Sequence, residues 1–164
     1  MLVYHGSYME IQKADLTYSR HNLDFGKGFY VTTMRKQADK WAVRKARMTN
    51  RTPVVSIYEF DIIDLHILTF DGYTVDWLDF VVKNRAADHG PHGYDAVYGN
   101  IADDDVAVIV NDYMRLLRLN RITENGKQFY LEQLQFSKPN NQYSVATQKG
   151  IDALMFIKSY VLEA

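Results

Sequence analysis

A glycine turn that runs into a strand and then a helix is the feature that most constrains this 164-residue chain. Gly26 and Gly28 precede residues 29–33 (FYVTT), whose aromatic and β-branched side chains predict a short strand. Residues 34–50 follow, with alanines and Trp41 at three- and four-residue intervals, which predicts a helix with one face turned inward. The turn therefore places a strand beside a helix.

Two aromatic side chains of this unit suggest a binding slot. Tyr30 lies in the predicted strand and Trp41 on the predicted helix, so their rings could form two opposite walls. Aromatic faces carry negative potential, and such a slot suits a flat, cationic ring. The alternative is that both side chains pack in the core, as tyrosine and tryptophan usually do in a strand–helix unit.

Composition excludes several classes of protein. The formal net charge of −1 argues against a dominant electrostatic attraction to nucleic acid or to an anionic membrane. The absence of cysteine excludes disulfides, a thiol nucleophile and a cysteine zinc site. No stretch approaches the roughly 18 consecutive apolar residues of a membrane helix, and the first residues do not resemble a signal peptide. We therefore expect a cytoplasmic protein with no membrane partner.

The remaining pattern predicts a single domain over residues 1–164, of the α+β class. Strands and helices do not alternate regularly, which argues against a doubly wound parallel sheet and favours small, mostly antiparallel sheets with flanking helices. The predicted strands are 2–5, 29–33, 54–61, 65–70, 95–99, 142–147 and 154–162. The predicted helices are 34–49, 75–87, 106–119 and 124–137, with a helical turn at 149–153.

Three charged or metal-binding patterns have both a functional and a structural interpretation. His89 and His92 with Asp88 are spaced for metal binding, but the Gly- and Pro-containing loop does not preorganise a site, so we expect no metal. The acidic run 103–105 precedes an apolar-periodic segment, as at a helix N-terminus. The basic outer face of helix 34–49 is either a solvated surface or a surface for an anionic partner.

Three motifs in order along the chain resemble the ADP-ribosyltransferase superfamily. They are His5-Gly6-Ser7, the run Phe25-Gly26-Lys27-Gly28-Phe29-Tyr30, and Gln142 at the start of a late strand. The resemblance is to the branch that contains diphtheria-type toxins and poly(ADP-ribose) polymerases. That branch carries a His-Gly-Ser/Thr motif, a Gly-x-Gly-aromatic-Tyr motif and a third residue, usually glutamate. It implies a fold with a split pair of small, mostly antiparallel sheets.

The whole chain also resembles an uncharacterised bacterial family that has been grouped with ADP-ribosyltransferase toxins, often beside a small antitoxin gene. The shared motifs here are Tyr4-His5-Gly6-Ser7, residues 23–30, the segment from Trp77 to Arg85, and the Gln142-Tyr143 strand. The resemblance implies an enzyme that transfers ADP-ribose from NAD to a macromolecular acceptor. It also implies a small antitoxin protein as a partner.

The resemblance assigns roles to specific residues. His5 would bond a ribose hydroxyl of NAD, and the backbone of Gly6 would pair with the nicotinamide carboxamide. Tyr30 and Trp41 would enclose the nicotinamide ring, and Arg20 would bind the pyrophosphate or the adenosine ribose. In all, it implies catalytic roles for His5, Tyr30 and Gln142, and NAD contacts from His5, Gly6, Ser7, Arg20, Tyr30 and Trp41.

Departures from the motif leave alternatives open. Gln142 can bond a ribose hydroxyl but brings no negative charge to the cation-like transition state, so Glu132 or Asp24 could act instead. Ser144 and Ala38 also stand where relatives carry a glutamate and a hydroxyl. The alternatives are an NAD-binding module without turnover, an NAD glycohydrolase, and a phosphotransferase on RNA ends. For the last we would expect a more basic chain with a clear pair of phosphate-binding arginines.

Overall fold

The computed structural model describes residues 1–86, 90–134 and 140–163, and these form an α+β fold. Predicted residues that fall outside this range are Ala87, the metal candidates Asp88 and His89, and the end of helix 124–137. The strands are β1 (Leu2–Ser7), β2 (Phe29–Val31), β3 (Val54–Phe60), β4 (Ile67–Thr69), β5 (Ala96–Gly99), β6 (Gln142–Val145) and β7 (Leu154–Val161). The helices are α1 (Arg35–Thr49), α2 (Val75–Arg85), α3 (Asp104–Arg118), α4 (Glu124–Leu134) and α5 (Gln148–Asp152), with a 3-10 turn at Leu16–Tyr18.

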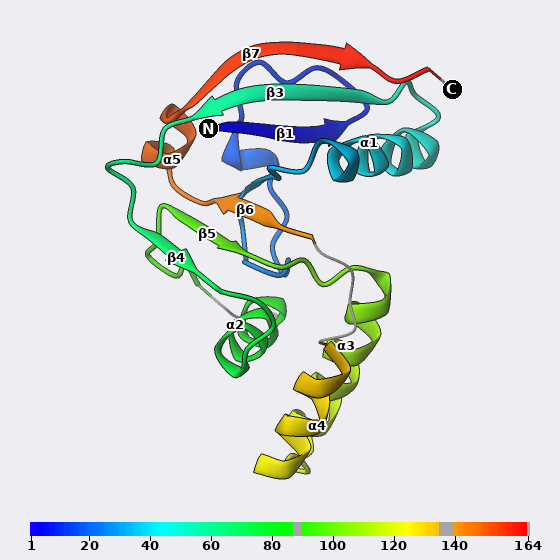
Figure 1. The fold of residues 1–164 in the computed structure, drawn as a ribbon, viewed down its shortest axis with the longest axis vertical. Coiled ribbons are helices and arrows are strands. Elements are labelled where there is room, and N and C mark those ends of the chain that lie inside the picture. The colour runs from blue at the N-terminus through cyan, green and yellow to red at the C-terminus, as the bar shows by residue number, and fades with distance from the viewer. Residues whose placement is uncertain (87–89, 135–139, 164) are drawn as a thin grey trace.

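The strands form two small sheets, as expected. One has the order β1-β3-β7 and is wholly antiparallel. The other has the order β2-β6-β5-β4, in which only the β4–β5 pair is parallel. In Figure 1 the three-stranded sheet lies at the top with α1 beside it, and the labelled strands β6, β5 and β4 lie below.

Apolar side chains divide the molecule into layers. Val3, Phe29, Tyr58 and Tyr143 belong to a buried cluster that joins strands of both sheets. The opposite side of the four-stranded sheet packs on α2, α3 and α4 through a second cluster that includes Trp77. The helices of that second cluster extend downward in Figure 1. A third, small cluster of Ala38, Ala42 and Val55 holds α1 against β3 on the outer face of the three-stranded sheet.

Alternation along β2 and β6 assigns each residue to a layer. Phe29 and Val31 point into the inter-sheet cluster, whereas Tyr30 packs against the cluster of α2, α3 and α4. The same alternation places Tyr143 in the inter-sheet cluster and turns Gln142 and Ser144 to the face of Tyr30. Tyr30, Ser144 and Gln142 therefore share one face of the four-stranded sheet.

Helix boundaries follow local capping signals. Asp103 caps α3 by accepting a hydrogen bond from the Val106 N–H at 3.2 Å, which confirms the structural explanation of the acidic run. Helix α1 ends at Thr49, and its C-cap residue, Asn50, adopts a left-handed φ of 51°. No helix of the described residues is long and apolar enough to cross a membrane.

Candidate active site

The candidate site forms where β1, at the edge of one sheet, meets β2, at the edge of the other. Tyr4 and Thr32 exchange both backbone hydrogen bonds, at 2.8 and 3.0 Å, in an isolated antiparallel bridge. Backbone groups two residues apart in a strand point to the same side, so Gly6 turns its N–H and C=O the same way as Tyr4. Within the described ranges the two strands pair only through this bridge, so the Gly6 backbone faces an edge that no strand of those ranges covers. We call residues 4–6 and 30–32 the β1–β2 junction.

His5 ties this junction together. Its Nδ1 lies 2.6 Å from the carbonyl oxygen of Tyr30, and its ring stacks on Phe29 with 4.3 Å between centroids. A carbonyl only accepts, so Nδ1 carries the proton and Nε2 is left as an acceptor. Burial of the ring, and then the neighbouring charge of Lys45, lower the pKa of His5 to about 3, although the Tyr30 carbonyl acts in the opposite direction. His5 is therefore neutral at physiological pH.

Lys45 completes the environment of His5 and was not predicted from the sequence. Its Nζ donates to the Gly6 carbonyl at 2.8 Å and lies 3.4 Å from His5 Nε2. Burial and the nearby cation of Arg20 lower the pKa of Lys45 to about 8. Two cations thus lie close together at the junction. Sequence spacing could have revealed this lysine, because Lys45 lies four residues after Trp41 and residues with this separation share one face of a helix.

Gly6 is required by the approach of α1. A Cβ at this position would lie 2.1 Å from the Ala38 carbonyl oxygen, 2.6 Å from the Ala42 nitrogen and 3.0 Å from the Trp41 Cβ. The helix therefore lies directly on the β1 backbone, with Trp41 at the contact. The sequence predicted that β1 stops at this glycine, which is wrong, since β1 continues to Ser7.

Tyr30 turns its hydroxyl to the glycine turn. The hydroxyl donates to the Gly26 carbonyl at 2.7 Å and accepts from the Phe25 N–H at 3.1 Å. Burial raises the pKa of Tyr30 far above its usual value, so the phenol stays protonated. The Ser19 hydroxyl closes the same loop by bonding both the N–H and the C=O of Gly28, at 2.8 and 2.7 Å. The turn is thus held by side chains on both sides.

Ser144 fills the space beneath this turn. It lies directly opposite Tyr30 in the β2–β6 pair, and a Cβ on Gly28 would come within 2.2 Å of its hydroxyl. The Ser144 hydroxyl is buried and has no hydrogen-bond partner. It is near enough to the Tyr30 phenol to oppose the rise that burial causes in that group's pKa, but the two groups are not aligned for a hydrogen bond.

Gln142 joins a buried polar network centred on Asp24. Gln142 Nε2 lies 3.4 Å from Asp24 Oδ2, which also accepts from the Ala102 N–H at 3.0 Å. Asp24 Oδ1 accepts from Arg85 Nε at 2.9 Å and from Nη2 at 2.6 Å. We call Asp24, Arg85, Ala102 and Gln142 the Asp24 network. The charge of Asp24 also reaches Tyr30, whose pKa it helps to raise.

A family model described as a protein of unknown function (DUF3990) matches residues 1–156. The chain belongs to this family. No curated protein and no solved structure gives a significant match.

In this DUF3990 member, the residues that the motifs selected lie on two faces of the four-stranded sheet, with the His5 ring on Phe29 and the Tyr30 and Gln142 side chains on the opposite face. His5, Gly6 and the Tyr30 backbone meet at the β1–β2 junction, and Gln142 lies two residues from Ser144, which opposes Tyr30. Arg20 is exposed but close enough to Lys45 to affect its pKa, and Ser7 is buried in β1.

Two other predicted features are placed differently. Glu132 is exposed on α4, where its carboxylate accepts from Gln128 at 3.4 Å, whereas Asp24 is the carboxylate that contacts Gln142. The two proposed aromatic walls, Tyr30 and Trp41, do not pair with one another among the ring contacts of the described residues. Tyr30 packs towards Phe25, and Trp41 lies at Gly6.

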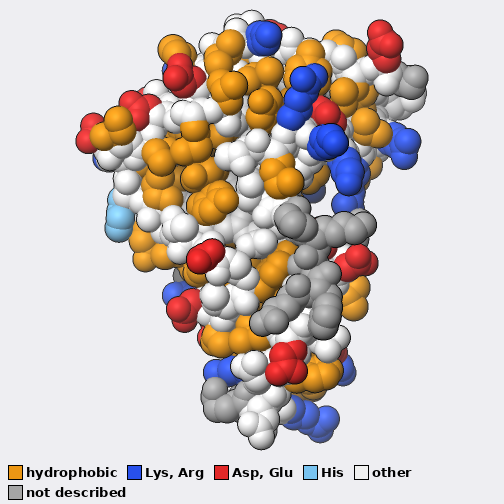
Figure 2. Space-filling view, in the orientation of Figure 1, with side chains coloured by type: hydrophobic (Ala, Val, Ile, Leu, Met, Phe, Trp, Pro, Cys, Tyr) orange, Lys and Arg blue, Asp and Glu red, His pale blue; other side chains and the backbone are white. Residues whose placement is uncertain are grey.

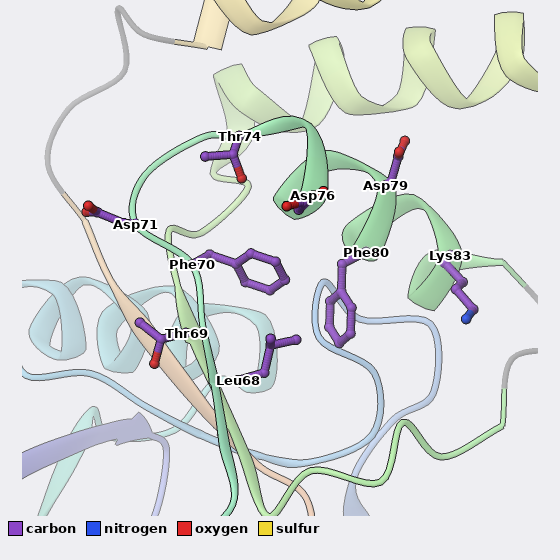
Figure 3. A pocket seen from close by; sticks show the side chains of 9 residues that line it. All are labelled: Leu68, Thr69, Phe70, Asp71, Thr74, Asp76, Asp79, Phe80 and Lys83. Atoms are coloured by element: carbon purple, nitrogen blue, oxygen red, sulfur yellow. The ribbon is translucent and has the colours of Figure 1, made fainter.

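A shallow hollow of about 530 Å³ lies elsewhere, between β4 and α2. Figure 3 shows Phe70 and Phe80 side by side at its base, with aspartates around the rim. Its lining shares no residue with the β1–β2 junction or the Asp24 network. The residues that the structure describes contain no group of three or more His, Cys, Asp or Glu placed to hold a metal ion.

Proposed function

We propose that this protein is an NAD-dependent mono-ADP-ribosyltransferase that acts in the bacterial cytoplasm as a toxin. In this proposal it transfers ADP-ribose from NAD to a macromolecular acceptor and is held in check by a small antitoxin protein. The β1–β2 junction carries the proposal. There His5 and the outward backbone of Gly6 meet the backbone of Tyr30, and Tyr30 shares one face of the four-stranded sheet with Gln142, whereas the His5 ring stacks on Phe29. We interpret the two small sheets as an ADP-ribosyltransferase-like fold.

The groups at the junction fit the parts of NAD. The N–H and C=O of Gly6 suit a primary carboxamide, which offers one acceptor and two donors. Lys45 and Arg20 are neighbouring cations, since the charge of Arg20 helps to lower the pKa of Lys45, and such a pair suits a pyrophosphate. Trp41 lies beside Gly6, where its indole face could cover a cationic nicotinamide ring.

The reaction requires little covalent chemistry from the protein. The bond between the ribose C1′ and the nicotinamide nitrogen breaks, and its electron pair leaves with the nicotinamide. A nucleophile of the acceptor then bonds C1′ and loses its proton. The transition state carries positive charge on the ribose, so preorganised oxygens near its hydroxyls supply the stabilisation. Gln142 offers such an oxygen, and the charge of Asp24 lies one hydrogen bond away.

An NAD-binding module without turnover is the second candidate, with NAD glycohydrolase activity as its variant. Two observations favour it. Lys45 Nζ already donates to the Gly6 carbonyl at 2.8 Å, so the Lys45 side chain must move before a carboxamide can bind to this carbonyl. Residue 142 is also a neutral amide, and the carboxylate that it contacts, Asp24, is paired with Arg85.

Incubation with adenylate-labelled NAD, alone and with bacterial lysate, separates these functions. Label on a macromolecule supports the transferase, free ADP-ribose supports the glycohydrolase, and binding without cleavage supports the module. Absence of both binding and cleavage would refute all three. Growth arrest on expression, relieved by the product of a neighbouring small gene, would support the toxin assignment.

Fluorescence can test the binding site directly, because the chain has two tryptophans. Trp77 is fully buried and donates to the Asn100 carbonyl at 3.0 Å, so quenching by NAD should come from Trp41. Trp41→Ala should weaken NAD binding by about 5- to 100-fold, the usual value of one stacked aromatic ring. Met48→Ala, on an exposed side chain of the same helix, is the control and should leave affinity unchanged.

A further inference from the structure

We propose that Asp24 is a positioning residue that orients Gln142, so that the amide oxygen of Gln142 serves as the acceptor for a substrate hydroxyl. The inference rests on the proposed function for its catalytic consequence, but the orientation itself is a property of the free protein. It explains how a glutamine can replace a carboxylate at this position.

The Asp24 carboxylate is fully committed to donors. Arg85 supplies two hydrogen bonds to Oδ1, and Ala102 and Gln142 supply one each to Oδ2. The Asp24 and Arg85 side chains are only 12% and 16% exposed, so their ion pair is largely shielded from water. An ion pair in such a setting, together with the two further donors, holds the Asp24 carboxylate in place.

The charge of Asp24 decides how the Gln142 amide lies. An ionised carboxylate only accepts hydrogen bonds, so Gln142 must turn its NH₂ group towards Asp24. The carbonyl oxygen, Oε1, then points away from the carboxylate. None of the described residues donates a hydrogen bond to Oε1, and Gln142 is only 2% exposed, so Oε1 lies in a nearly dry setting without a donor among these residues. Gln142 thus offers one free acceptor on the face of the sheet that also carries Tyr30.

The position of Asp24 in the chain makes this role specific. Asp24 lies next to Phe25, whose N–H bonds the Tyr30 hydroxyl, so the same turn fixes Tyr30 and orients Gln142. Arg85 brings α2 to the network, and Ala102 brings the segment before α3. A purely structural role for Asp24 would hold these segments together but would not depend on the chemistry of residue 142.

A double-mutant cycle distinguishes orientation from structure. In Asp24→Asn, residue 24 can either donate to Gln142 or accept from it, so the Gln142 amide group is free to flip. The kcat for NAD cleavage should then fall about tenfold or more, with KM nearly unchanged. In Gln142→Glu both side-chain atoms at the end of residue 142 are acceptor oxygens, so this side chain no longer needs to be oriented. Next to Asp24, however, the new carboxylate adds like-charge repulsion. Asp24→Asn should therefore be harmless or beneficial in the Gln142→Glu background. A loss of the same size in both backgrounds would overturn the proposal.

Nitrogen-15 NMR of the unliganded protein tests the orientation without any activity. The Gln142 side-chain amide signal should shift in Asp24→Asn. It should stay in place in Asp112→Asn, which removes another arginine-paired carboxylate, on α3. In the wild type, one Gln142 amide proton should exchange with solvent more slowly than the other. Equal, fast exchange of both protons would overturn the proposal, even if Asp24→Asn does not fold. If NAD neither binds nor is cleaved, the proposed function fails while this NMR test still decides the orientation.

Discussion

Replacing Gly6 with alanine should separate α1 from β1. The new Cβ would lie 2.1 Å from the Ala38 carbonyl oxygen against an ordinary contact of 3.4 Å, so the helix would have to retreat by about 1.3 Å. The second obstacle, the Ala42 nitrogen at 2.6 Å, is also backbone, so no side-chain rotation relieves the overlap. Overpacking of this kind costs about 3 kcal/mol at the upper end of its usual range. The displacement would also pull Lys45 away from the Gly6 carbonyl.

Urea denaturation measures this cost. With a slope of about 2 kcal/mol per molar urea, the midpoint of Gly6→Ala should fall by about 1.5 M. Gly126→Ala is the matched control, because a Cβ there meets only the Thr123 hydroxyl at 3.4 Å, within helix α4. That variant should gain about 0.5–1 kcal/mol from helix propensity. If Gly6→Ala keeps the wild-type midpoint while Gly126→Ala shifts as expected, α1 does not rest on β1 as described.

Three further substitutions test the charges and polar groups near the site. The pKa of His5 is lower in the folded chain, about 3, than its unfolded value of 6.5, so the unfolded chain takes up the proton first as the pH falls. Stability should therefore be lost from pH 6.5 downward, by about 2.7 kcal/mol at pH 4.5, and His5→Gln should show a smaller loss between denaturation curves at pH 7 and 4.5. Lys40→Glu replaces repulsion from Lys36 and Arg44, each four residues away on α1, by attraction, and should raise stability by about 0.5–1 kcal/mol at low salt but not at 1 M salt. Ser144→Ala removes a buried hydroxyl without a partner and should be neutral or stabilise by about 1 kcal/mol in the same assay, whereas a loss above 1 kcal/mol would mean that the hydroxyl bonds the Tyr30 phenol.

The basic outer face of α1 fits both interpretations made from the sequence, a solvated surface and a surface for an anionic partner. Lys36, Lys40, Arg44 and Arg47 are exposed along one side of the helix. Figure 2 shows basic side chains gathered at the upper right, over the region of α1 in Figure 1. Arg35 is instead engaged, since its Nε donates to the Tyr160 hydroxyl at 3.1 Å. If the effect of Lys40→Glu on stability depends on salt, the face is a solvated surface. If this variant no longer modifies the acceptor with ADP-ribose, the face is a docking surface.

Local patterns predicted most of the secondary structure. The start of α3 at Asp103 and the strand character of β3 both depend on neighbours within a few residues, and the structure agrees with them. Small, mostly antiparallel sheets were also predicted, because irregular alternation of strands and helices does not suit a parallel sheet, whereas their number, two, was implied only by the family resemblance. Gly26 is a local case as well, since its φ of 72° is what a tight turn demands.

The two other motif glycines show where the sequence pattern fails. Gly28 is needed because Ser144, more than a hundred residues later, lies against it, and Gly6 because α1 does. Read as a local signal, Gly6 predicted the end of a strand that in fact continues. A glycine that makes room for a distant backbone looks the same in sequence as one that makes a turn.

The sequence by itself determined the elements, the class of fold and the order of His5, Tyr30 and Gln142, because backbone preference and side-chain periodicity are set by nearby residues. Only the tertiary structure decided the surroundings of these side chains: Lys45 on His5 and Gly6, and Asp24 with Arg85 on Gln142. These contacts join residues 39 to 118 positions apart. Burial gives such contacts their strength, and burial exists only once the sheets and helices have packed.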